Sequence, residues 1–172
     1  MDTIRITSGN LRGRSIKSPK SDLTHPMGSR EKIALFNMVS SILSGARVLD
    51  AFAGSGALGI EALSRGAHEV VFVEKNRHAA QIIKNKLASL GLEAQVVCSD
   101  IVNYTDKDGF DLILLDPPYD SFKIESIEKI GHLLKKNGIM VLSHPGDAPT
   151  IDKLTLQKTH QYAAAHLSVY VK

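Results

Sequence analysis

The residues with the clearest chemical meaning are four consecutive ones, Asp116-Pro117-Pro118-Tyr119. Two adjacent prolines fix the backbone and remove two N–H donors, so a carboxylate, an outward-facing carbonyl and an aromatic ring are held together. Asp116 and the Pro117 carbonyl can each accept an N–H of an exocyclic amine on a nucleobase. This would aim the nitrogen lone pair at an electrophilic methyl group while the Tyr119 ring stacks on the base. Hydride transfer has no use for such a corner; in isolation the tetrapeptide would be an ordinary turn.

A second candidate site is the segment Arg47–Gly59, RVLDAFAGSGALG. An apolar run ends at Asp50, and Gly54 and Gly56 open the backbone just before a helical pattern begins. Glycines there let a ligand reach the backbone N–H groups at the positive end of the helix dipole. The spacing also satisfies the dinucleotide-binding fingerprint, so the loop alone does not decide which cofactor it binds.

Carboxylates follow the successive apolar runs of the chain. They are Asp50, Glu74, Asp100 and Asp116. Because ligands bind beyond the carboxyl ends of the strands in an open parallel sheet, we expect these acids and the glycine loop to face one cleft. Glu74 lies where a carboxylate takes both hydroxyls of a ribose, which NAD and S-adenosylmethionine both contain. Any one of these acids could instead be a helix cap or a solvated strand end.

Strands that alternate with helices must position these residues. Strands are predicted at Val48 and Leu49 and over Val70–Glu74, Ala94–Cys98, Phe110–Leu115 and Ile139–Ser143. Helices are predicted over Ile33–Leu43, from Ala57 to near Gly66, over His78–Leu90 closed by Gly91, and over Ile124–Lys136 closed by Asn137-Gly138. Nearly all-apolar strands in this alternation predict an α/β fold with a mostly parallel sheet and helices on both faces. Leu154–Gln157 and Leu167–Val171 are expected to finish the sheet as an antiparallel pair.

The size and composition of the chain fit a single domain. Its 172 residues are 43% hydrophobic, enough for one substantial core. We expect residues 1–29 to form a basic N-terminal hairpin and loop, and residues 30–172 the catalytic core. There is no membrane-spanning apolar run and no apolar core of a signal peptide, so we expect a soluble, cytoplasmic protein. The single cysteine, Cys98, is expected to be a buried, inert thiol. The histidines lack metal-site spacing, so no metal is expected.

Positive charge is concentrated near the N-terminus. Seven basic residues against two acidic ones between Thr3 and Lys32 give +5, whereas the remainder sums to −2. Turn residues between short alternating segments, Ile4–Thr7 and Ser15–Lys17, predict a hairpin. Such charge asymmetry indicates a polyanion partner, with a solvated surface face as the alternative. The candidate RNA contacts are Arg5, Arg12, Arg14, Lys17 and Arg30.

Three motifs together carry a family resemblance: VLDAFAGSGALGIEALSRGA, VVFVEKN and LILLDPPY. They resemble those of the S-adenosylmethionine-dependent methyltransferases that modify amino groups of nucleobases. The order of basic hairpin, proline loop, LFN helix, glycine loop and DPPY resembles the 16S ribosomal RNA guanine-N2 methyltransferase family. The likeness covers the chain up to about Ser143 and implies a Rossmann-like class I methyltransferase fold with a seven-stranded sheet.

The resemblance also implies roles for individual residues. The methionine portion of S-adenosylmethionine would be held by Asp50, Ala53, Gly54, Ser55 and Gly56, the ribose by Glu74 beside Lys75, and the adenine by Asp100 and Ile101. Asp116, Pro117, Pro118 and Tyr119 would present the target amine. The chain departs from the family pattern at His25-Pro26-Met27, at Ile33 in place of an acid, and at Tyr162-Ala163-Ala164 in the tail. These departures lie on the substrate side.

The expected function is methyl transfer from S-adenosylmethionine to guanine N2 in 16S ribosomal RNA. The substrate would be ribosomal RNA or an assembling small subunit, and the protein a monomer without a membrane partner. One alternative is a methyltransferase for DNA adenine or cytosine, because DPPY serves any exocyclic amine. Another is a non-catalytic RNA-binding assembly factor. An NAD-dependent oxidoreductase is the least favoured.

Overall fold

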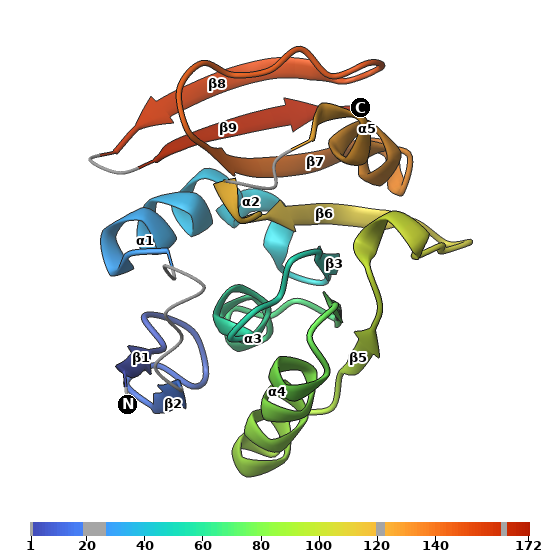
Figure 1. The fold of residues 1–172 in the computed structure, drawn as a ribbon. Coiled ribbons are helices and arrows are strands. Elements are labelled where there is room, and N and C mark those ends of the chain that lie inside the picture. The colour runs from blue at the N-terminus through green and yellow to red at the C-terminus, as the bar shows by residue number, and fades with distance from the viewer. Residues whose placement is uncertain (1, 19–26, 120–122, 163–164) are drawn as a thin grey trace.

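One central sheet dominates the computed structural model, which describes residues 2–18, 27–119, 123–162 and 165–172 (Figure 1). The strands are β1 Asp2–Arg5, β2 Ser15–Ser18, β3 Arg47–Asp50, β4 Glu69–Glu74, β5 Gln95–Cys98, β6 Phe110–Leu115, β7 Leu134–His144, β8 Thr155–Gln161 and β9 His166–Val171. The helices are α1 Ser29–Met38, α2 Ser40–Leu43, α3 Ala57–Ser64, α4 Arg77–Leu90, the 3-10 helix η1 Ile101–Asn103, and α5 Ile124–Gly131. None of the helices in the described segments is long and apolar enough to cross a membrane.

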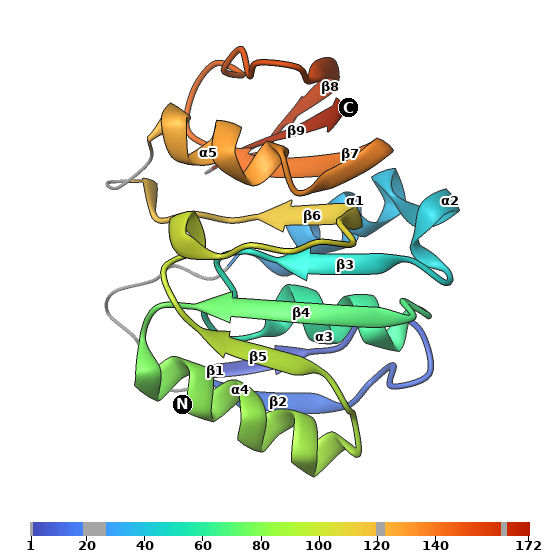
Figure 2. The ribbon, with the colours of Figure 1, turned by 90° about the vertical axis from the view of Figure 1, so that its right-hand side faces the viewer.

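The sheet has seven strands in the order β5-β4-β3-β6-β7-β9-β8. Strands β3 to β7 pair in parallel, whereas β9 lies antiparallel between β7 and β8. The strand order reverses between β3 and β6, which is where ligands bind in such sheets. Figure 2 shows the arrowheads of β3, β4, β5 and β6 pointing to the same side of the molecule. The α/β architecture and the separate N-terminal hairpin β1–β2 are confirmed.

Hydrophobic side chains fill both faces of the sheet. On one face, α1 to α4 and the hairpin residues Ile6 and Ile16 pack around Val48, Phe72 and Leu114. On the other, α5 and η1 cover a second cluster that includes Leu49, Val71 and Ile113. Neighbouring residues of one strand thus face opposite layers, because side chains alternate along a strand.

Several sequence-based boundaries were wrong. The strand predicted over Leu154–Gln157 runs to Gln161, and the helix predicted from Ile33 begins at Ser29. The helix predicted over Ile33–Leu43 is two helices, because Val39 leaves helical geometry at φ −112° and ψ 10°. The helix predicted to reach Lys136 ends at Gly131, and β7 begins at Leu134, not Ile139. Leu134 pairs with Phe110 of β6, and this pairing across the sheet outweighs the local helical pattern. Asn137, at φ 63°, lies at an irregularity within β7 and does not cap a helix.

The prediction of a buried cysteine was also wrong. Cys98 is exposed because it ends β5, and β5 is one of the two edge strands of the seven-stranded sheet. An apolar run at an edge is covered on fewer sides than one inside the sheet, and local sequence does not tell the two apart.

Candidate active site

The glycine loop connects the end of β3 to the start of α3. Gly54 and Gly56 have φ values of +48° and +76°, in the left-handed region that side chains disfavour. A Cβ on Gly56 would lie 3.2 Å from Ile83 of α4, so this glycine also permits close packing. The nearest atom to a Cβ on Gly54 is the Phe52 carbonyl oxygen at 3.8 Å, which leaves the loop open at that point. The openness fits a loop whose backbone meets a ligand.

Asp50 and Gly59 join the sheet to the helix behind this loop. The Asp50 carboxylate accepts the Gly59 N–H at 2.8 Å. Burial raises the pKa of Asp50 to about 7, although the Gly59 hydrogen bond opposes the rise. A Cβ on Gly59 would lie 2.2 Å from the Phe72 ring, so the third glycine of the fingerprint serves helix–strand packing.

The predicted ribose-binding carboxylate contacts the glycine loop directly. Glu74 accepts the Gly54 N–H at 2.8 Å and the Asn76 N–H at 2.7 Å. One strand farther along, Asp100 caps the start of η1 and accepts the Val102 N–H at 3.1 Å, next to the buried Ile101. The acids at the ends of β3 and β4 therefore both contact the segment that runs from the loop into α3.

The remaining predicted cofactor residues differ in their surroundings. Ala53 is buried and donates its N–H to the Val73 carbonyl at 3.1 Å. The Ser55 carbonyl accepts a hydrogen bond from Lys86 Nζ at 2.6 Å. Lys75 follows β4 and is exposed. The role of each toward a ligand stays a prediction.

Asp116 follows β6 and is held from two directions. The Ser143 hydroxyl and the backbone N–H of Met27 hydrogen-bond its carboxylate. Burial nevertheless raises the pKa of Asp116 to about 6, because desolvation outweighs these two hydrogen bonds. The carboxylate is therefore ionised at neutral pH and can accept hydrogen bonds.

The aromatic ring of the same segment is fixed by the same serine. The Tyr119 hydroxyl lies 2.8 Å from Ser143 Oγ, whereas the residue as a whole is 36% exposed. Pro117 is buried and Pro118 is exposed. An anchored but partly exposed ring next to a carboxylate can stack on a planar base.

Two residues of this region escaped the sequence analysis. Ser143 is the last residue but one of β7 and the last residue of the strand predicted there, so the rule that singled out acids at strand ends would have found it if hydroxyls had been included. Lys86 falls four residues after Ile82 and four before Leu90, in the apolar stripe of α4. A charged residue in such a stripe faces the core, which indicates that it has a buried polar partner.

Comparisons with known proteins place this geometry in a family. Residues 4–171 match the family model described as Conserved hypothetical protein 95. The chain belongs to this family. It is 37% identical over 138 residues to Ribosomal RNA small subunit methyltransferase D of Escherichia coli K12, covering 78% of this chain and 68% of that protein. It is 32% identical over 160 residues to the protein of the same name from Haemophilus influenzae, covering 86% and 82% of the two chains.

Solved structures agree with the family assignment. The Escherichia coli protein yhhF, which its description assigns provisionally to the methyltransferases, superposes with a TM-score of 0.89 at 29% identity and covers 99% of this chain and 98% of its own. The resemblance to ribosomal RNA small subunit methyltransferases is thereby confirmed, as is the Rossmann-like class I fold.

In this family member, a buried carboxylate of α3 anchors the N-terminal hairpin. The buried Glu61 carboxylate accepts the N–H groups of Thr7 at 2.9 Å and Ser8 at 3.0 Å. It also pairs with Arg65 at 2.8 Å and with Lys32 at 3.3 Å. Lys32 is therefore a buried partner of Glu61 and does not belong to the exposed basic surface, contrary to its inclusion in the basic segment.

The predicted RNA contacts lie on the hairpin and at the start of α1. Arg5, Arg12, Arg14 and Arg30 are exposed. Lys17 lies in β2, but its side chain is outside the described part of the structure, as are His25 and Pro26.

The described part of the structure includes three of the residues at which the chain departs from the family pattern, Met27, Ile33 and Tyr162. Met27 reaches Asp116 through its backbone, and Ile33 is 41% exposed on α1. In the tail, Tyr162 is described, whereas Ala163 and Ala164 are not.

Proposed function

We propose that this protein methylates the exocyclic N2 of a guanine in 16S ribosomal RNA. Its cofactor is S-adenosylmethionine, in keeping with its family and fold. One observation carries the proposal. Ser143 hydrogen-bonds both Asp116, which follows β6, and Tyr119, and these residues lie at the carboxyl ends of the parallel strands, as the glycine loop does.

The cofactor residues fit such a ligand. Gly54 and Gly56 keep the loop backbone accessible, Glu74 stands beside it for the ribose, and Asp100 with Ile101 forms the next strand end for the adenine. Asp50 braces α3 through Gly59, so we assign it an indirect part in holding the methionine portion. When bound, S-adenosylmethionine supplies a methyl group activated by a positively charged sulfur.

The chain's own contribution is to prepare the amine. A guanine amine is a weak nucleophile because its lone pair is delocalised into the ring. Hydrogen bonds from the amine to Asp116 and to the Pro117 carbonyl would hold the nitrogen with its lone pair directed at the methyl, while the Tyr119 ring stacks on the base. After the methyl has moved, the substituted nitrogen loses one proton to water.

The RNA substrate is supported by charge and by the relatives' names. Arg5, Arg12, Arg14 and Arg30 give the hairpin side of the molecule an exposed basic surface. Phosphate neutralisation by such residues supplies the sequence-independent part of RNA affinity. Two relatives bear the name ribosomal RNA small subunit methyltransferase. We place the enzyme, as a monomer, in the cytoplasm with its ribosomal substrate.

The decisive experiment is the transfer of labelled methyl from S-adenosylmethionine to three substrates in parallel: unmodified small ribosomal subunits, naked 16S RNA and duplex DNA. We expect N2-methylguanosine in a ribosomal sample. Label in DNA alone would overturn the RNA substrate while retaining the chemistry. Cofactor binding without any transfer would favour the assembly-factor alternative.

A further inference from the structure

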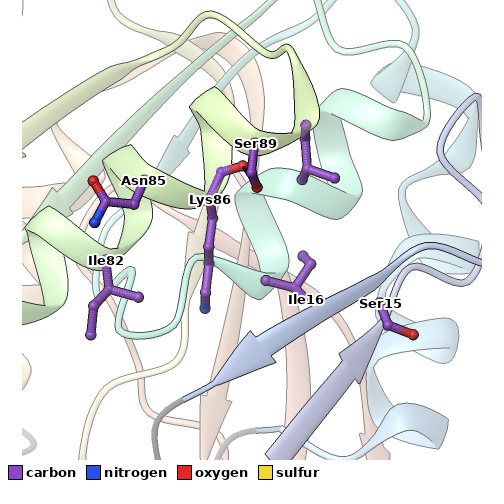
Figure 3. A pocket seen from close by; sticks show the side chains of 7 residues that line it. Ser15, Ile16, Ile82, Asn85, Lys86 and Ser89 are labelled. Atoms are coloured by element: carbon purple, nitrogen blue, oxygen red, sulfur yellow. Dashed lines mark hydrogen bonds between the residues drawn. The ribbon is translucent and has the colours of Figure 1, made fainter.

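A groove separates the hairpin strand β2 from helix α4. Its cavity volume is about 390 Å³, and it is lined by Ser15 and Ile16 of β2 and by Ile82, Asn85, Lys86, Ser89 and Leu90 of α4. In Figure 3 the Lys86 side chain extends away from α4 between Ile82 and Ile16, and its nitrogen is the atom farthest from the helix. The volume falls within the range of about 300–1,000 Å³ that small-ligand sites occupy.

The groove contains a buried ammonium group that lacks a carboxylate partner. Lys86 is only 7% exposed, and its Nζ donates to the Ser55 carbonyl at 2.6 Å. Within the described residues no Asp or Glu lies within ion-pair distance of it. Burial lowers the pKa of Lys86 to about 8, so it remains mostly charged at neutral pH. A buried cation without a counter-ion is unfavourable, and an anion in the groove would relieve this.

The rim of the groove offers hydrogen bonds to such an anion. Ser15 and Asn85 are exposed and carry polar side chains, whereas the exposed Ser89 already donates its hydroxyl hydrogen to the Lys86 carbonyl at 2.8 Å. The Asn85 amide oxygen accepts from Gln81 at 3.0 Å, which leaves the Asn85 NH2 group as a donor. Ile16, Ile82 and Leu90 supply apolar surface for the sugar or base of a nucleotide.

Both walls of the groove are positively charged. Helix α4 carries Arg77, Lys84 and Lys86 and has no Asp or Glu. The hairpin segment 2–18 contains four basic residues and one acidic residue, and the exposed Arg14 directly precedes Ser15 at the rim. The groove therefore continues the basic surface assigned to RNA, and charge complementarity favours a polyanion over a neutral ligand.

We propose that the groove between β2 and α4 binds one nucleotide of the RNA substrate, with its phosphate between Lys86 and the Asn85 amide group. This proposal rests on the proposed function. It adds a contact that lies behind the glycine loop, apart from the DPPY corner that presents the target amine. Lys86 thereby holds RNA on one side and the Ser55 carbonyl on the other.

Two substitutions on adjacent residues of α4 test the site. Ser89→Glu places a negative charge in the groove, whereas Ala88→Glu adds the same charge on an exposed neighbour that does not line it. Binding of an unmodified 16S RNA transcript should weaken about tenfold for Ser89→Glu and less than about threefold for Ala88→Glu. The affinity for S-adenosylmethionine should stay unchanged in both. Equal RNA affinities for the two variants would overturn the proposal.

A second pair of variants tests Lys86 itself. Lys86→Met should reduce the slope of log affinity against log salt by about 0.7, the value for one phosphate contact on single-stranded RNA. Lys84→Met removes an exposed charge outside the groove and should change that slope less. An unchanged slope for Lys86→Met, with weakened cofactor binding alone, would assign Lys86 only to the glycine loop and refute the site.

The two proposals fail in different ways. RNA binding is measured without turnover, so a lack of methyl transfer would count against the proposed function and leave the groove result standing. Weakened binding to assembled subunits by Ser89→Glu, with unchanged binding to naked RNA, would identify an acidic protein as the occupant and overturn the RNA site.

Discussion

The hydroxyl oxygen of Ser143 lies 2.8 Å from the hydroxyl oxygen of Tyr119, 24 residues apart in sequence. Ser143 is 2% exposed near the end of β7, whereas Tyr119 belongs to the loop after β6. Since Ser143 also hydrogen-bonds Asp116, one buried hydroxyl fixes both the carboxylate and the ring of the DPPY segment. The neighbouring strand thus sets the geometry of the corner that we assign to the target amine.

Removal of the Ser143 hydroxyl should shift the pH dependence of methyl transfer. In the native protein Asp116 has a pKa of about 6, and its hydrogen bond from Ser143 lowers that value. The transfer rate should therefore rise with pH around a midpoint near 6, because the ionised form of Asp116 is the one that accepts the hydrogen bond from the amine. In Ser143→Ala the midpoint should move to higher pH, because the charged form loses a donor. Single-turnover rates across pH would measure it, and an unmoved midpoint would contradict this account.

Loss of the carboxylate should affect turnover far more than cofactor binding. We expect Asp116→Ala to slow methyl transfer by at least about a hundredfold, the size of effect seen when one preorganised polar contact is removed. The dissociation constant for S-adenosylmethionine, measured by calorimetry, should change by no more than a few fold. Asp152→Ala, at an exposed carboxylate, is the control for loss of charge. Unchanged turnover in Asp116→Ala would remove Asp116 from the mechanism.

Asp50 should make the stability of the protein depend on pH. Its folded-state pKa of about 7 lies above the ordinary value of 3.8, so the folded state binds the proton more tightly than the unfolded state. The resulting stabilisation is present below pH 3.8 and is lost as the pH rises to about 7. Asp50→Asn retains an oxygen acceptor for Gly59 and should avoid this loss. Its melting temperature relative to the native protein should therefore be more favourable at pH 8 than at pH 5; a constant difference would argue against a raised pKa.

The docking of the hairpin on α3 should be sensitive to one glycine. A Cβ on Gly9 would lie 1.7 Å from the Ser64 carbonyl oxygen, at a φ of +82°. Gly9→Ala should lower the free energy of unfolding by about 1–3 kcal/mol and weaken RNA binding, with cofactor affinity unchanged. Gly13→Ala is a matched control, because Gly13 has a φ of +86° and no neighbouring atom within 4 Å in the described structure. Denaturant unfolding of both variants would test this, and equal losses would show that backbone strain alone is responsible.

The fold class was predictable because its signals are local. An apolar run followed by a carboxylate, a glycine loop and a helical stripe each occupy a short stretch of chain, and their repetition predicts a parallel sheet with one ligand edge. The strand over Phe110–Leu115 and the helix closed by Gly91 were found at these positions. Boundaries failed where a partner from another part of the chain intervened, as at Leu134, which pairs with Phe110.

By itself the sequence determined the family, the cofactor class and the edge of the sheet that bears the acids, since these depend on residue types at fixed short spacings. Tertiary structure alone decided which polar groups support the site. Glu61 meets Thr7 from 54 positions away, and Lys86 meets Ser55 from 31 positions away. The physical reason is that a buried charge is tolerated only where folding brings donors or a counter-charge to it. That meeting depends on how helices and strands pack in three dimensions, which no local pattern encodes.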